Sequence, residues 1–101
     1  MKKTCLCIAL FIPMTAPFAS AQEAGICEQA GNIAEVIMMA RQEGVPLSQV
    51  VKIAKESFNE EKAVVDMAVL AYEQPRYSSA AVKQQTIQDF RNNVELACYK
   101  R

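Results

Sequence analysis

The sequence predicts an all-α protein, a small four-helix up-down bundle that follows a cleaved signal peptide and is stapled by one disulfide. Three observations support this fold class. After residue 21, apolar residues recur at three- and four-residue steps, and no alternating run typical of a strand interrupts them. Glycine, proline and cap-forming residues divide that pattern into four segments. Two cysteines, Cys27 and Cys98, lie near the two ends of the same region.

Residues 1–21 contain the three parts of a secretory signal peptide. Met1-Lys2-Lys3 is a basic start, residues 5–12 are apolar, and Ala19-Ser20-Ala21 offers the small side chains that a signal peptidase requires. The apolar run is shorter than the roughly 20 residues that cross a bilayer, and a proline follows it. We expect cleavage after Ala21, no membrane span afterwards, and a periplasmic or secreted domain over residues 22–101. Retention by an uncleaved peptide is the alternative.

The first two helices are expected over residues 24–43 and 47–57. Gly44 supplies the left-handed position after the first helix, and Pro46 suits the first turn of the second. The first helix repeats apolar residues at helical spacing, namely Ile26, Ala30, Ile33, Ile37 and Ala40. The second has an apolar side made of Val50, Val51, Ile53, Ala54 and Phe58.

The third helix, residues 60–73, is apolar over more than half its circumference, so we expect it to be the central helix. Asn59 is its expected N-cap and Pro75 ends it. Ser78 or Ser79 caps the fourth helix, which continues to about Cys98.

Short turns between four helices favour the up-down-up-down arrangement, which brings the start of the first helix beside the end of the fourth. Cys27 and Cys98 occupy those two places, and an exported protein favours a disulfide between them. The alternative, a reactive redox pair, lacks the C-x-x-C spacing that lowers a thiol pKa.

The residue types present predict no enzyme, no cofactor and no metal. A small enzyme that uses carboxylates alone is the alternative to the first of these predictions. The chain contains no histidine, which removes the commonest general base and the usual dyads. Two paired cysteines without histidine make no zinc site. No glycine-rich phosphate loop occurs. Removal of the signal peptide leaves nine basic and eleven acidic side chains, a net charge of about −2, which disfavours nucleic acid and anionic membrane partners.

One segment has the residue types that anchor protein interfaces. Tyr72, Arg76 and Tyr77 surround a turn fixed by Pro75. The alternative is a turn that packs its own tyrosines over the junction of the last two helices. A second polar turn, residues 41–44, is interpreted as the end of the first helix. Arg91 is interpreted as part of a solvated helix face.

A family resemblance follows from four features of the sequence. These are Cys27, Arg41-x-Glu43-Gly44 at the end of the first helix, Tyr72-x-x-Pro75-x-x-Ser78 before the last, and Cys98. In these features the chain resembles a group of small, functionally uncharacterised exported helical proteins of proteobacteria. The resemblance implies a periplasmic helical domain and no activity, and it transfers no site residues.

The function expected from these observations is a non-catalytic periplasmic interaction module. It would bind another envelope protein as an inhibitor, an immunity-type factor or an accessory subunit. The alternative is a small envelope-stress chaperone that exposes apolar helix faces at low pH. A homodimer is also compatible with the sequence.

Overall fold

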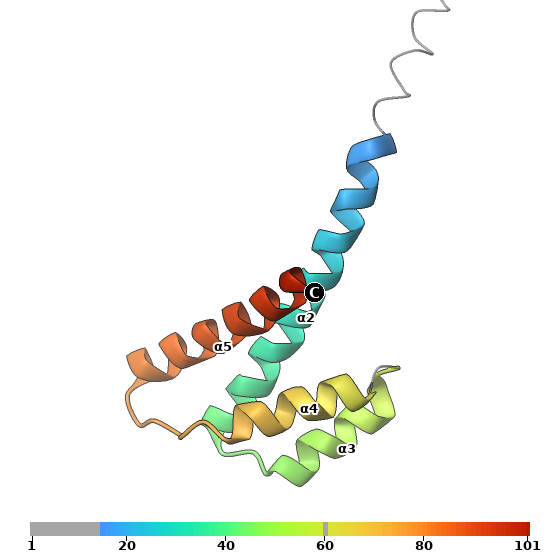
Figure 1. Cartoon of the computed structure of the whole chain (residues 1–101). Helices are drawn as coiled ribbons and strands as arrows, with labels where there is room; N and C mark the ends of the chain where they lie inside the picture. Colours follow the sequence, from blue (N-terminus) through green and yellow to red (C-terminus); the bar gives the residue numbers. More distant parts are fainter. Residues whose placement is uncertain (1–14, 60) are drawn as a thin grey trace, which may run out of the picture.

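The structure, a computed structural model, describes residues 15–59 and 61–101 and contains four helices there (Figure 1). They are α2 (Thr15–Glu43), α3 (Leu47–Ser57), α4 (Glu61–Tyr72) and α5 (Ala80–Lys100). No strand occurs within these ranges. The predicted all-α class is therefore confirmed, and most helix ends agree with the predicted ones within two residues.

α2 begins earlier than predicted. Its backbone is helical from Thr15 and remains so through residues 21 and 22. Alanine, the best helix former, recurs through this stretch, and no residue there ends the helix. Residues 1–14 of the predicted signal peptide lie outside the described residues. The signal peptide and its cleavage after Ala21 therefore stay predictions.

Local backbone geometry explains the ends of three helices. At the end of α2, Gly44 has a φ of 87°, its N–H donates to the Arg41 carbonyl at 3.1 Å, and the Val45 N–H donates to the Ala40 carbonyl at 3.0 Å. This pair of bonds is a Schellman motif, and it confirms the predicted role of Gly44. Pro46 lies one residue earlier than predicted, at the N-cap of α3 rather than in its first turn. At the start of α5 the capping residue is Ser79, whose Oγ accepts from the Val82 N–H.

The central helix is α2, and the prediction that the third helix would be central was wrong. α2 contacts all three other helices, whereas α4 buries only one face, formed by Val64, Ala68 and Ala71. Figure 1 shows α3 and α4 as an antiparallel pair beside the C-terminal part of α2, and the C-terminal end of α5 at the middle of α2. Because α5 packs mainly on α2, the up-down-up-down bundle stays a prediction.

The core is a single cluster that joins all four helices, and alanines allow the helices to approach one another. Ala34, Ala54, Ala68 and Ala71 are almost fully buried around larger apolar side chains such as Met38 and Phe90. The predicted disulfide is confirmed, with the Cα atoms of Cys27 and Cys98 5.5 Å apart. It joins α2 to the end of α5.

Candidate functional site

The two polar turns singled out by the sequence lie against each other, and Gln42 joins them. This side chain is only 1 % exposed. Its Nε2 donates to the Pro75 carbonyl at 2.9 Å, and its Oε1 accepts from the Tyr77 N–H at 2.9 Å. Its backbone carbonyl, near the end of α2, accepts from Lys83 Nζ at 2.8 Å and from Arg76 Nε at 3.3 Å. Two cations thus interact with the negative end of the helix dipole.

Tyr72 and Arg41 form a second connection between the same turns. The Tyr72 hydroxyl donates to the Val45 carbonyl at 2.6 Å. The Arg41 guanidinium carbon lies 5.3 Å from the centroid of the Tyr72 ring, and Arg41 Nε donates to the Gln74 carbonyl at 2.9 Å. Burial raises the pKa of the Tyr72 hydroxyl above its usual 10.0, and the positive charge of Arg41 opposes that shift. These contacts make the region around Tyr72 a packed junction.

The structure places the three predicted partner-binding residues, Tyr72, Arg76 and Tyr77, around one turn. Tyr72 and Arg76 bond to backbone carbonyls of the same chain. Tyr77 uses its backbone N–H in the junction, while its side chain is 37 % exposed. The contacts thus support the packing alternative for Tyr72 and Arg76, and partner binding by the turn stays a prediction.

An apolar groove of about 450 Å³ between α2 and α3 was not predicted from the sequence. It opens to solvent, because Val36 on α2 is 64 % exposed and Ile53 on α3 is 49 % exposed. Asn32 and Gln49 are the polar residues of its lining, and no charged residue belongs to it. The apolar lining consists of Ile33, Val36, Ile37, Ala40, Val45, Val50, Ile53, Ala54, Phe58 and Val64.

Sequence reasoning missed this groove because it assigned the whole apolar side of the second helix to the core. In the structure, α3 rests mainly on α4, so Val50 and Ala54 are buried while Ile53 and Phe58 remain exposed. The apolar stripe of α3 is wider than the strip that its neighbours cover. The width of this apolar stripe was the feature of the sequence that could have predicted the groove.

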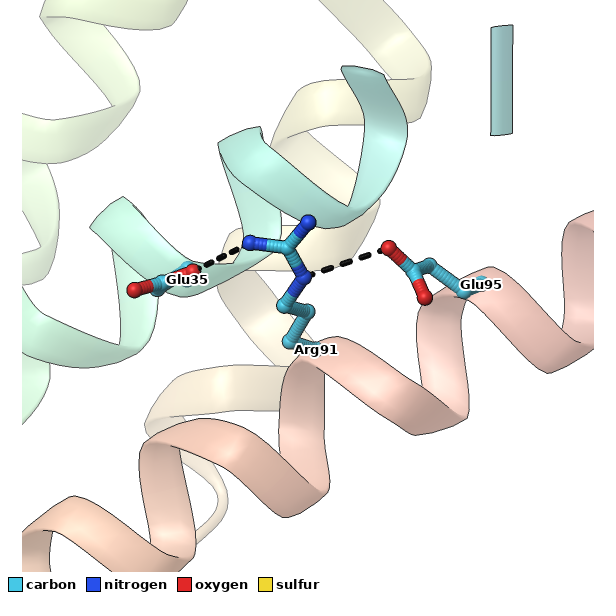
Figure 2. A network of polar contacts seen from close by, with 3 residues as sticks. All are labelled: Glu35, Arg91 and Glu95. Atoms are coloured by element: carbon cyan, nitrogen blue, oxygen red, sulfur yellow. Dashed lines mark hydrogen bonds and ion pairs between the residues drawn. The ribbon is translucent and has the colours of Figure 1, made fainter. Parts of the chain in front are cut away.

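A network of charges links α2 to α5 (Figure 2). Arg91 Nη1 donates to Glu35 Oε1, and Arg91 Nε donates to Glu95 Oε2 at 3.1 Å. The hydrogen bond to Glu35 is the main reason why the pKa of Arg91 is raised above its ordinary value. The interpretation of Arg91 as a solvated residue was wrong, because its side chain is only 23 % exposed and joins two helices. We assign it a structural role.

Two other kinds of site, a metal centre and a membrane-spanning helix, have no candidate among the described residues. Within residues 15–59 and 61–101, no three histidine, cysteine or acidic side chains group closely enough for a metal ion. None of the described helices combines the length and apolar character needed to cross a bilayer. Comparisons with family models, curated proteins and solved structures found no match. The family resemblance therefore stays an expectation, and the groove and the turn are the candidate binding surfaces of the described residues.

Proposed function

We propose that this chain is a non-catalytic interaction module of the periplasm or cell exterior that binds an apolar helix of another envelope protein. In this proposal residues 1–21 are removed on export, and residues 22–101 act as an up-down helical module. The observation that supports binding is the groove between α2 and α3. Its volume, about 450 Å³, falls within the range of roughly 300–1,000 Å³ that is usual for binding pockets.

The shape and chemistry of the groove favour a helix as its occupant. Two neighbouring helices that diverge leave space for the side chains of a third, and amphipathic helices bind such grooves through apolar residues spaced three to four apart. α3 has 11 residues and is therefore about 16 Å long, which matches about three turns of an occupant. The absence of charge from the lining favours apolar side chains, because an unpaired charge placed there would lose its hydration.

Site-specific photo-crosslinking in the exported protein tests this proposal. A photoreactive residue at Val36 should crosslink to one dominant envelope protein. Ile53→Glu, which places a charge in the groove, should abolish that crosslink. Leu70→Glu is the matched control, because Leu70 is similarly exposed at 55 % but lies on α4 outside the groove. Both positions are solvent-accessible, so the two variants should have melting temperatures close to that of the parent.

Three results would contradict the proposal. One is a crosslink that Leu70→Glu weakens as much as Ile53→Glu does, since the groove would then not be the contact. Another is a crosslink to a lipid or another small apolar molecule in place of a protein. A crosslinked product of twice the chain mass would assign the groove to a second copy and replace the proposed partner with a homodimer.

A stress chaperone is the second candidate, and the distribution of exposed apolar side chains favours it. Each described helix has at least one, for example Ile26, Ile53, Leu70 and Leu96. A chaperone would crosslink to many proteins from several positions, and their number would increase at acidic pH. A single partner, crosslinked from Val36 but not from Leu70, would exclude this candidate.

A further inference from the structure

A second cavity, of about 170 Å³, lies where the turn of residues 73–79 meets α5. Met38 and Phe90, which are both buried, contribute apolar surface to it. The rest of its lining is polar or aromatic and comes from the turn and from one side of α5, namely Gln74, Tyr77, Thr86, Asp89 and Asn93. It shares no lining residue with the apolar groove. The partly exposed ring of Tyr77 belongs to this cavity.

Several polar groups around this cavity have unused hydrogen-bonding capacity. Asp89 is the one charged residue of the lining, and its Oδ1 accepts from Gln85 Nε2 at 2.9 Å, an uncharged donor. No ion pair involves Asp89 within the described residues. In the same part of the chain, the side-chain amides of Gln74 and Asn93 and the hydroxyl of Tyr77 have no hydrogen-bond partner. The cavity thus combines a carboxylate, two amide oxygens and an aromatic ring.

This combination suits an arginine side chain better than other common groups. A guanidinium is planar, permanently charged and has five N–H donors, so it can bond a carboxylate and an amide oxygen together. Its flat face also stacks on aromatic rings, which Tyr77 and Phe90 offer here. A lysine ammonium lacks the planar face, and an anionic group would be repelled by Asp89. The small volume fits one side chain rather than a helix.

We propose that this cavity is a subsite for an arginine side chain of the protein partner. The inference rests on the proposed function, since it assumes that the partner is a protein. It adds that the partner presents an arginine to the face formed by α5 and the 73–79 turn. In this assignment Tyr77 is the partner-binding residue of the turn, and Asp89 and Asn93 are binding residues that the sequence did not single out.

The test is an NMR titration of the disulfide-intact exported protein with Nα-acetylarginine methylamide. We expect saturable chemical-shift changes at the backbone amides of Thr86, Asp89 and Asn93. The matched control ligand is the citrulline analogue, which has the same shape without the charge. It should bind at least about tenfold more weakly, because it lacks the positive charge that strengthens hydrogen bonds to the Asp89 carboxylate.

Protein variants make the titration specific to this cavity. Asp89→Asn keeps an oxygen for Gln85 and removes the charge, so it should weaken binding of the arginine probe by at least about tenfold. Asp66→Asn removes an exposed carboxylate on α4 outside the cavity and should leave binding unchanged. Tyr77→Leu should also weaken binding, because it removes the aromatic face.

Equal binding of the arginine and citrulline probes would overturn the inference, and so would undiminished binding to Asp89→Asn. Neither outcome depends on the apolar groove, because the titration contains no partner protein. Failure here would leave the crosslinking result at Val36 intact. Conversely, a failed crosslink with a positive titration would remove the proposed groove function and leave an arginine site.

Discussion

Gln42 connects the end of α2 to the turn of residues 73–79. It is the one buried polar side chain of the described residues, and its amide bonds the carbonyl of Pro75 and the N–H of Tyr77, about 35 residues away. A buried polar group is tolerated when all its hydrogen bonds are made, and no buried side-chain nitrogen or oxygen is unpaired within the described residues. Gln42 therefore defines how the turn lies on α2.

We predict that Gln42→Ala lowers the free energy of unfolding by about 3 kcal/mol. The substitution removes two part-buried hydrogen bonds, each worth about 0.5–1.5 kcal/mol, and leaves a space where a fully buried side chain was packed. Urea unfolding followed by circular dichroism measures the change. Gln84→Ala, at an exposed position of α5, is the control and should have almost no effect. Equal effects of the two substitutions would show that the junction contributes no stability.

Tyr72 makes stability depend on pH in the alkaline range. Its folded pKa is raised above 10.0, so the folded state keeps the proton that the unfolded state loses. This contribution to stability is fully present below the unfolded pKa and is lost as pH rises through the folded pKa. Ionisation also removes the hydroxyl donor to the Val45 carbonyl. Tyr72 should therefore stabilise the fold at neutral pH and lose that effect in strong alkali.

We predict that the stability difference between the parent and Tyr72→Phe is largest near neutral pH and shrinks as pH rises above about 10. Unfolding free energies measured at several pH values give this difference directly. A difference that stays constant across the range would mean that the hydroxyl proton has no role in stability.

At the scale of elements, the contact between α2 and α5 depends on a small residue and a charged network. A Cβ atom at Gly31 would lie 2.3 Å from Glu95 Oε2, so glycine at this position lets the Glu95 side chain approach α2. Glu95 then pairs with Arg91, which also bonds Glu35 on α2. Beyond this network towards the C-terminus, Leu96 and Tyr99 are more than half exposed. The end of α5 therefore depends on polar contacts and the disulfide more than on apolar burial.

The pairing of α3 with α4 leaves part of the apolar surface of α3 exposed. Since α3 rests mainly on α4, its apolar stripe is only partly covered, and the uncovered part forms the groove with α2. An exposed apolar groove marks either an interaction site or a surface that promotes aggregation. The helix with the smallest contact with α2 thus lines the groove with four residues, Gln49, Val50, Ile53 and Ala54.

At the scale of the whole molecule, the disulfide is the main constraint on the unfolded chain. Cys27 and Cys98 are separated by 71 positions, and closing a loop of that length stabilises by about 4 kcal/mol in the chain-entropy model. A domain of this size has a total stability of only about 5–10 kcal/mol. A large share of that total is therefore expected to come from one bond.

We predict that Cys27→Ser with Cys98→Ser lowers the free energy of unfolding by about 4 kcal/mol. Amide hydrogen exchange should increase first in the part of α5 that follows Arg91, because this part contains Cys98 and has no fully buried residue of its own. Denaturant unfolding and exchange followed by mass spectrometry measure the two effects. An unchanged midpoint in the double variant would show that packing alone closes the fold.

The helices and the disulfide were predictable because their signals are local or follow from the expected order of helices. Gly44 can adopt a positive φ, Ser79 offers a cap, and Pro75 prevents α4 from continuing beyond the residues before it. The pairing of Cys27 with Cys98 required only that the two ends of the region meet. By contrast, the predicted central helix was wrong, because the apolar content of α4 does not show which of its faces has a partner.

The sequence by itself determined the all-α class, the ends of most helices and the residues that form the disulfide. Only the tertiary structure decided that α2 is central, that Gln42 bonds a turn about 35 residues away, and that Ile53 and Phe58 line a groove. Helix ends depend on backbone conformation within a few residues, which the local sequence specifies. Grooves and junctions depend on the angles at which helices pack, and those angles result from contacts between side chains far apart in the chain.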